Sequence, residues 1–86
     1  MYNLVFSASA AKYYKRCDTK TKRILNKCFS DLQSCPIVGP NIKRLRGELE
    51  GLYRYRSGNL RVVYKISLSE QIVYIVTIGS RGDVYK

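Results

Sequence analysis

The residues of this chain best suited to chemistry are cations interleaved with aromatic rings in one short stretch. Between Ile42 and Tyr64 the cationic side chains are Lys43, Arg44, Arg46, Arg54, Arg56 and Arg61, and Tyr53, Tyr55 and Tyr64 lie among them. Guanidinium groups bind phosphate through paired N–H donors, and aromatic rings stack on nucleobases. The stretch therefore favours a nucleic acid as the partner.

The charge of the whole chain agrees with this interpretation. The 86 residues carry 16 Lys and Arg against 6 Asp and Glu, which gives a net charge of +10. This length predicts a single domain over residues 1–86, and a hydrophobic content of 45% is ordinary for a globular chain. So strong a bias suits a nucleic acid, an acidic protein or an anionic membrane surface. A basic solvated surface with no specific role is the plain alternative.

Other classes of site find little support in the composition. The chain has no histidine, and its three cysteines show no Cys-x-x-Cys spacing, so we expect no metal site and no cofactor. The first residues do not have the pattern of a signal peptide, and no apolar run approaches the length of a membrane span. We therefore expect a cytoplasmic protein that does not bind a membrane.

The elements that must position the cations follow from periodicity. Residues 2–6 predict a short strand, and Ser7 is a plausible N-cap for a helix that ends near Arg16. Asp18 or Thr19 then caps a longer helix that Pro36 ends. Apolar residues recur along it at helical spacing, at Ile24, Leu25, Cys28, Phe29, Leu32 and Cys35.

The second half of the chain has the period of strands. After a loop over 35–41, we expect strands over 52–56, 60–67 and 71–78, joined by tight turns at 57–59 and 68–70, with Gly79 ending the last strand. Successive short turns make an antiparallel meander. The order predicts an α+β fold: strand, helix, helix and then a three-strand antiparallel meander, with both helices packed on one face of the sheet.

Strand alternation then divides the side chains between the two faces. In the middle strand of the meander Leu60, Val62, Tyr64 and Ile66 alternate with Arg61, Val63 and Lys65, and the first set suits the core. Arg54 and Arg56 share a face opposite Tyr53 and Tyr55. We expect Arg54, Arg56, Arg61 and Lys65 to gather on the open face, as a concave and positively charged surface.

Two motifs in this order resemble the RelE/ParE toxin superfamily, the small basic toxins of bacterial and archaeal toxin–antitoxin pairs. One is Leu45-x-Gly47 followed by Gly51-Leu-Tyr-Arg54-x-Arg56-x-Gly58-x-x-Arg61-Val-Val-Tyr64, and the other is Ile78-Gly79-x-Arg81-x-x-x-Tyr85. The resemblance covers nearly the whole chain and implies one RelE-like domain. RelE-like members cut messenger RNA in the ribosomal A site, whereas ParE-like members poison DNA gyrase. The Arg81 and Tyr85 ending favours the first branch.

The resemblance also implies roles for single residues. Arg61 and Arg81 match arginines that stabilise the scissile phosphate, and Tyr85 matches a tyrosine that handles the base or transfers a proton. Arg54 and Arg56 stand where the best-studied members carry lysines. Because arginine keeps its proton, these two bind phosphate only, and Tyr85 is our candidate for the general base. We expect further RNA or phosphate contacts from Lys65, Lys43, Arg44 and Arg46.

The expected function is a metal-independent endoribonuclease that uses the 2′-OH as nucleophile and so inhibits translation. Its implied partners are the ribosome, messenger RNA and a RelB-like or similar antitoxin. Alternatives are a gyrase inhibitor and a non-catalytic module that binds RNA or the ribosome. Residue by residue, Arg61 could simply pair with Glu48 or Glu50, Arg54 and Arg56 could be solvated, and Tyr85 could be frayed. Tyr64 suits the core better than the site.

Overall fold

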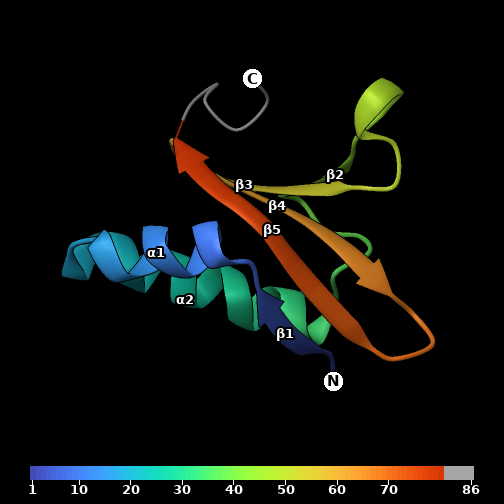
Figure 1. Cartoon of the computed structure of the whole chain (residues 1–86), viewed down its shortest axis with the longest axis horizontal. Coiled ribbons are helices and arrows are strands. Elements are labelled where there is room, and N and C mark those ends of the chain that lie inside the picture. The colour runs from blue at the N-terminus through green and yellow to red at the C-terminus, as the bar shows by residue number, and fades with distance from the viewer. Residues whose placement is uncertain (81–86) are drawn as a thin grey trace.

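Two helices cover one face of a mixed five-stranded sheet (Figure 1). The computed structural model describes residues 1–80. Its strands are β1 (Asn3–Phe6), β2 (Ile42–Arg44), β3 (Tyr53–Ser57), β4 (Leu60–Ser67) and β5 (Ile72–Ser80). Its helices are α1 (Ala8–Arg16), α2 (Thr19–Ser34) and the short 3-10 helix η1 (Gly47–Leu49). The strand order is β1-β5-β4-β3-β2. The expected α+β class, with both helices on one face of the sheet, is confirmed.

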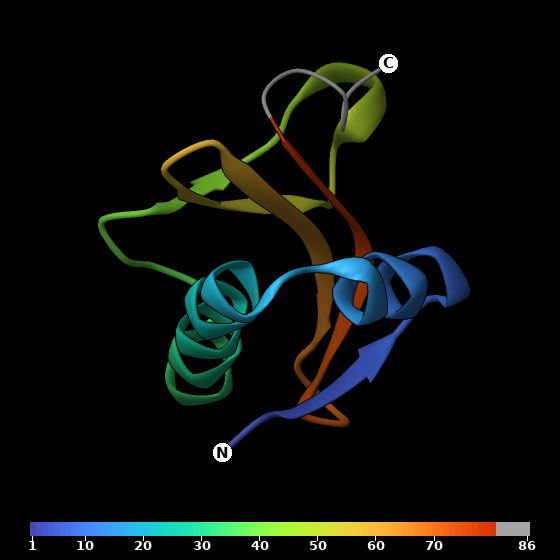
Figure 2. The same cartoon turned by 90° about the vertical axis from the view of Figure 1, so that its left-hand side faces the viewer.

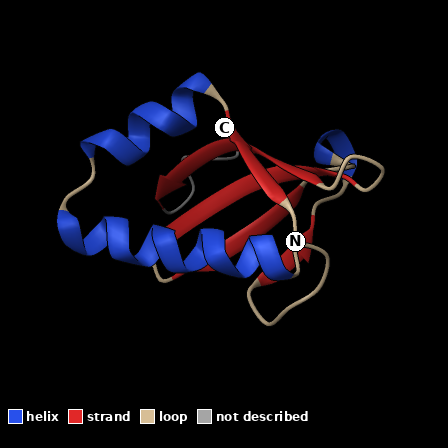
Figure 3. Cartoon of the chain, turned by 90° about the horizontal axis from the view of Figure 1, so that it is seen from below, coloured by secondary structure: helices blue, strands red, loops and turns tan. Residues whose placement is uncertain are grey.

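Both long helices begin at the predicted caps. The Ser7 hydroxyl accepts a hydrogen bond from the Ala10 backbone N–H at 3.1 Å, and the Asp18 carboxylate accepts one from the Thr21 N–H at 2.8 Å. The link between the helices is short (Figure 2), so α1 and α2 form a hairpin beside the sheet (Figure 3). Within residues 1–80, no helix has the length and apolar character needed to cross a membrane.

The antiparallel meander of β3, β4 and β5 also forms as predicted. The β3–β4 turn places Gly58 at a φ of 59°, which a type II′ hairpin requires at its first central position. The expectation that Gly79 ends the last strand is wrong. Gly79 pairs with Arg61 and Ser80 pairs with Leu60, so the ladder with β4 carries β5 past the glycine.

Two further strands extend the meander at its edges. β1 lies parallel to β5, from the pair Asn3–Ile72 to the pair Phe6–Ile75. β2 lies antiparallel to β3, with Lys43 opposite Arg54. The sequence did not predict β2, because a segment of three residues that includes two cations has no recognisable strand pattern. This strand forms through its hydrogen bonds with β3.

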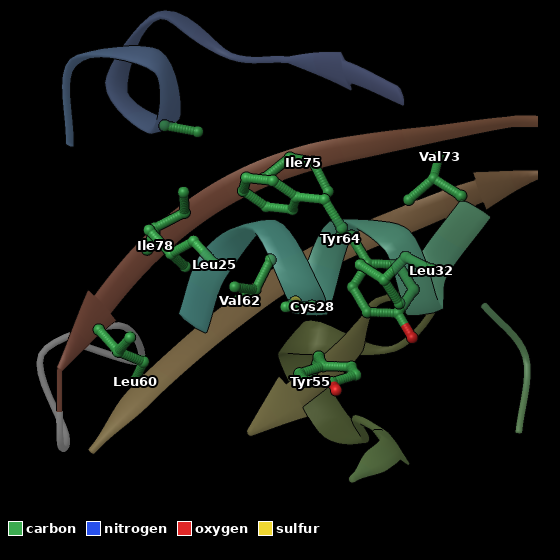
Figure 4. Packing of buried hydrophobic residues seen from close by; sticks show 12 residues of the cluster. Leu25, Cys28, Leu32, Tyr55, Leu60, Val62, Tyr64, Val73, Ile75 and Ile78 are labelled. Carbon is green, nitrogen blue, oxygen red and sulfur yellow. The ribbon is translucent and has the colours of Figure 1, made fainter. Parts of the chain in front are cut away.

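The core lies between the helices and the sheet (Figure 4). Leu25, Cys28 and Leu32 of α2 are at most 1% exposed. Tyr64 of β4 is fully buried, and its hydroxyl donates to the Pro36 carbonyl oxygen at 2.7 Å, which confirms Tyr64 as a core residue. Cys35 does not belong to the apolar stripe as expected. It follows the last residue of α2 and is exposed.

A β-bulge in β5 decides which side chains share a face. Val63 pairs with Thr77 but Tyr64 pairs with Ile75, so Val76 is the extra residue between them. The Val76 carbonyl oxygen accepts a hydrogen bond of 2.7 Å from the Ser7 hydroxyl, which also caps α1. The bulge turns both Ile75 and Ile78 toward the core, although they are three positions apart.

A hydrogen bond between α2 and β3 makes a pH dependence testable. The Tyr55 hydroxyl donates to Asp31 Oδ2 at 2.5 Å, and this bond is the main reason that the pKa of Asp31 is lowered; the nearby Lys27 ammonium lowers it further, against the effect of desolvation. Because the folded pKa lies below the unfolded value of about 3.9, this contribution is full above that pH and is lost as pH falls through the folded pKa.

We expect Asp31→Asn to reduce the free energy of unfolding at pH 7, by less than about 1 kcal/mol because the Asp31 side chain is 43% exposed. The difference from the parent chain should shrink as pH falls below about 4. Urea unfolding followed by circular dichroism at several pH values measures it. A difference that stays constant down to the lowest pH would contradict the role of the ionised carboxylate.

Candidate functional site

The β3–β4 hairpin places three arginines on the face of the sheet that the helices leave uncovered. Tyr55 pairs with Val62 and faces the core, so the neighbouring pair, Arg56 and Arg61, faces the other way. Arg54 shares that face two residues along β3. Like charges directly opposite on paired strands destabilise a sheet. The hairpin therefore holds a repulsive pair that some other interaction must offset.

Part of this charge is also shielded from water. The Nε and Nη1 atoms of Arg61 and the Nε atom of Arg54 are buried, and none of them has a hydrogen-bond partner among residues 1–80. A buried donor without an acceptor is costly, more so when it is charged, and native structures contain few of them. A bound anion would satisfy these donors and relieve the repulsion between Arg56 and Arg61 at the same time.

The surroundings of Arg61 offer little else to partner it. On β5 the residue opposite Arg61 is Gly79, which has no side chain, and opposite Val63 is Thr77. The ion pair seen among the described residues joins Lys27 and Asp31 on α2, at 3.4 Å. The alternative in which Arg61 pairs with Glu48 or Glu50 thus finds no support in that part of the chain.

The other predicted cations divide between several places. Lys43 lies on the open face, opposite Arg54, and Lys65 lies on the same face farther along β4. Arg44 pairs with Tyr53 on the helix side, and its guanidinium lies 5.9 Å from the centre of that ring. Arg46 is exposed before η1. Lys43, Arg44 and Arg46 line one surface hollow together with Glu50.

Two of the predicted catalytic residues, Arg81 and Tyr85, lie outside the described residues. Among the tyrosines that are described, two are held in the protonated form. Burial, followed by the hydrogen bond to Asp31, raises the pKa of Tyr55 to about 12, and burial raises the pKa of Tyr64 well above its ordinary value. Both rings lie on the helix side of the sheet, away from the arginine cluster. The described part of the site can therefore bind and neutralise an anion, but neither of these phenols can remove a proton there.

No group of three or more His, Cys, Asp and Glu side chains able to hold a metal ion is found in residues 1–80. The open-face cluster of Arg54, Arg56 and Arg61, hereafter the arginine cluster, is a candidate anion site built from side-chain cations. Its chemistry is recognition of phosphate and stabilisation of negative charge.

A helical hairpin on one face of a mixed sheet is the fold of the RelE-like toxins, as two solved structures show. The RelBE2 toxin–antitoxin complex of Mycobacterium tuberculosis matches with a TM-score of 0.80 and 26% identity, over 93% of this chain and 98% of that one. The isolated Escherichia coli RelE toxin matches with a TM-score of 0.79 and 24% identity, over 99% of this chain and 92% of that one, which shows the fold alone.

The sequence comparison leads to the family. The model of the ParE toxin of the type II toxin–antitoxin system parDE matches residues 4–85, and the chain belongs to this family, within the RelE/ParE superfamily. The toxin RelG of Mycobacterium tuberculosis is 37% identical over 59 residues, which are 67% of this chain. The match spans 64% of the length of RelG, so less than two thirds of that relative is covered.

Two parts of the site were not predicted from the sequence. The last strand was expected to end before Gly79, the residue opposite Arg61, although Ile78-Gly79-Ser80 has no turn residue other than the glycine. Val63 was predicted only as an alternating strand residue. Val63 is 3% exposed, although it faces away from the core, next to Arg54.

The buried donors of Arg61 predict that removing its guanidinium weakens phosphate binding without lowering the stability of the fold. Arg61→Met keeps an unbranched side chain but removes unpartnered buried donors and one half of the repulsive pair. We expect the free energy of unfolding to stay within about 0.5 kcal/mol of the parent chain or to rise. Inorganic phosphate should raise the melting temperature of the parent chain more than that of the variant.

Arg23→Met, at an exposed position of α2, is the matched control and should leave the phosphate effect unchanged. A loss of more than about 2 kcal/mol in Arg61→Met would mean that the guanidinium has a structural partner and would argue against an anion site.

Proposed function

We propose that this toxin is a metal-independent endoribonuclease that cuts messenger RNA in the ribosomal A site and so inhibits translation. The observation that carries the proposal is the arginine cluster, in which Arg54 and Arg61 have buried donors without a partner in residues 1–80 and Arg56 lies directly opposite Arg61. A phosphodiester is an anion of the right shape for paired guanidinium donors. The residue types match those expected from the superfamily.

The reaction assigns clear tasks to these side chains. The 2′-oxygen attacks the adjacent phosphorus, the O2′–P bond forms and the P–O5′ bond breaks. Negative charge builds up on the non-bridging oxygens as this happens, and fixed cations aimed at it lower the barrier. Arg61, with Arg54 and Arg56 beside it, supplies this stabilisation. None of the three can act as the base, because arginine does not lose its proton.

Proton transfer must come from elsewhere. We propose Arg81 as a further contact to the scissile phosphate. We propose Tyr85 as the group that takes the 2′-OH proton or orients the base. The 5′-oxygen needs a proton as it leaves. In this proposal the ribosome orients the RNA for in-line attack. A toxin that acts on ribosomes works in the cytoplasm.

Contacts with the ribosome have a natural location on the helices. The outer faces of α1 and α2 carry a group of mostly exposed cations: Lys12, Lys15, Arg16, Lys20, Lys22, Arg23 and Lys27. Such a surface binds ribosomal RNA through release of counterions, so its affinity falls steeply with salt. Lys43, Arg44, Arg46 and Lys65 are proposed contacts to the RNA backbone beside the cut.

An antitoxin is the proposed protein partner. Related folds were solved as complexes: RelBE2 of Mycobacterium tuberculosis, RelE–RelB of Pyrococcus horikoshii and YoeB–YefM of Staphylococcus aureus. A chain with net charge +10 is suited to an acidic or amphipathic partner, RelB-like or similar, whose helix and extended segment cover the basic face.

The proposal predicts that Arg61→Ala and Arg81→Ala each relieve growth arrest when the toxin is expressed. Removal of one such charge-stabilising donor typically lowers the rate about 100- to 1,000-fold. Primer extension on messenger RNA after induction measures the cleavage, and Ser30→Ala, at an exposed position of α2, is the control that should stay fully toxic. If both site variants still arrest growth as strongly as the parent chain, the mechanism is wrong.

A second prediction isolates the proton step. Tyr85→Phe keeps the ring but removes the hydroxyl. Cleavage of ribosome-bound messenger RNA by the purified variant should slow about 100-fold or more, with a changed dependence on pH, if this hydroxyl transfers the proton. An unchanged single-turnover rate would leave stacking as the only role of Tyr85.

One observation favours a different target. The family model that matches this chain is named for the ParE toxin of parDE, and the superfamily includes toxins that poison DNA gyrase. DNA-damage signalling with intact messenger RNA after induction would support gyrase. Codon-dependent cuts in messenger RNA would decide for the nuclease. Binding to ribosomes without any cut would indicate a non-catalytic module.

A further inference from the structure

A second cationic and aromatic pair lies on the open face, apart from the arginine cluster. Lys65 of β4 and Tyr74 of β5 are directly opposite each other, and the Lys65 ammonium lies 5.3 Å from the centre of the Tyr74 ring. Lys65 is exposed and Tyr74 is half-buried. On the other side of Tyr74, β1 contributes Val5, which is 44% exposed. The three residues form one row across three strands.

The phenol ring is tethered at its far end. The Tyr74 hydroxyl lies 3.5 Å from Glu70 Oε1, which also accepts a hydrogen bond of 3.0 Å from the Ser67 hydroxyl. The carboxylate at this end of the hairpin is thus engaged by two hydroxyls, and the salt bridge seen in residues 1–80 involves neither this carboxylate nor Lys65. Within the described residues the Lys65 ammonium contacts the face of the Tyr74 ring, and its charge can bind an anion.

Lys65 faces the same way as the arginine cluster by alternation along β4, and the β5 bulge turns Tyr74 to that face as well. Lys65 is four residues from Arg61 on one strand, and both point away from the core. At a rise of about 3.3 Å per residue, the two positions are about 13 Å apart. That is about four stacked nucleotides at about 3.4 Å each, and fewer in an extended strand.

We propose that Lys65 and Tyr74 form a second nucleotide subsite, which binds single-stranded RNA beside the segment held by the arginine cluster. A base stacks on the Tyr74 ring, flanked by Val5, and Lys65 moves from the ring to the adjacent phosphate. The exchange is favourable because stacking of a base on an aromatic side chain is stronger than an exposed cation–π contact. The long, flexible lysine stem makes the movement possible.

An RNA ligand fits this row better than a protein does. The open face carries Lys43, Arg54, Arg56, Arg61 and Lys65, and a strand running along β4 would meet positive charge at both ends. Aromatic rings interleaved with cations are the usual means of binding single strands without dependence on sequence. The subsite rests on the proposed nuclease function, and its test separates the two.

The test uses fluorescence anisotropy with RNA that cannot be cut because its 2′-hydroxyls are methylated. Two probes are compared, a dinucleotide and an eight-nucleotide strand. Only the longer one can reach from the arginine cluster to Tyr74. We expect Tyr74→Ala to weaken binding of the longer probe about tenfold and to leave the dinucleotide unaffected. Tyr74→Phe keeps the ring and should retain the parent affinity, although it loses the contact with Glu70.

Lys65→Ala should lower the slope of log affinity against log salt by about 0.7 for the longer probe, as expected for one phosphate contact to a single strand. The control lies on the helix side, away from the open face: Ser30→Ala, at an exposed position of α2, should bind both probes as the parent chain does. Circular dichroism confirms that each variant is folded.

Other results overturn the subsite. It is wrong if the parent chain binds the longer probe no more tightly than the dinucleotide, or if Tyr74→Ala weakens both probes equally. It is also wrong if Tyr74→Ala changes only the binding of a protein partner. Arg61→Ala tests the cluster separately: unchanged dinucleotide binding would count against the phosphate site of the proposed function and not against Tyr74.

Discussion

The register of the β3–β4 hairpin is the constraint on which the rest of the structure depends. Tyr55 opposite Val62 puts both side chains in the core, and this fixes Arg54, Arg56 and Arg61 on the other face. A slip of one residue would move every one of these side chains to the wrong side of the sheet. The two-residue turn at Gly58 holds the register locally, and the apolar surface of α2 holds it from above. The same register therefore determines both the packing of the core and the position of the arginines.

This placement of the arginines lowers the stability of the folded domain. A small domain has little stability to spare, yet this hairpin keeps Arg56 and Arg61 directly opposite each other. It also leaves nitrogen atoms of Arg54 and Arg61 buried without a hydrogen-bond partner in residues 1–80. The core on the opposite face offsets the cost, with Tyr64 tied through its hydroxyl to the loop that follows α2. Unsatisfied groups of this kind cluster at functional sites, and an anion bound there would accept the hydrogen bonds that the fold leaves unmade.

The β5 bulge shows how one inserted residue changes the use of a surface. By simple alternation Tyr74 and Ile78 would share a face. The extra residue, Val76, sends Ile78 into the core and leaves Tyr74 beside Lys65 on the open side. Its carbonyl oxygen is bound by Ser7, the same hydroxyl that caps α1. The start of the first helix and the shape of the last strand are thus joined at one side chain.

Much of this molecule followed from the sequence by itself. Helical spacing, the Ser7 and Asp18 caps, the Gly58 turn and the alternation along β4 are local signals, and they determined both helices, the meander and the face shared by the arginines. The tertiary structure alone decided the parallel pairing of β1 with β5, the addition of β2, the continuation of β5 through Gly79, and the turning of Arg44 toward Tyr53. It also decided which guanidinium nitrogens lack partners. These features depend on strand pairing and side-chain contacts between residues distant in the chain, so the local periodicity of the sequence does not predict them.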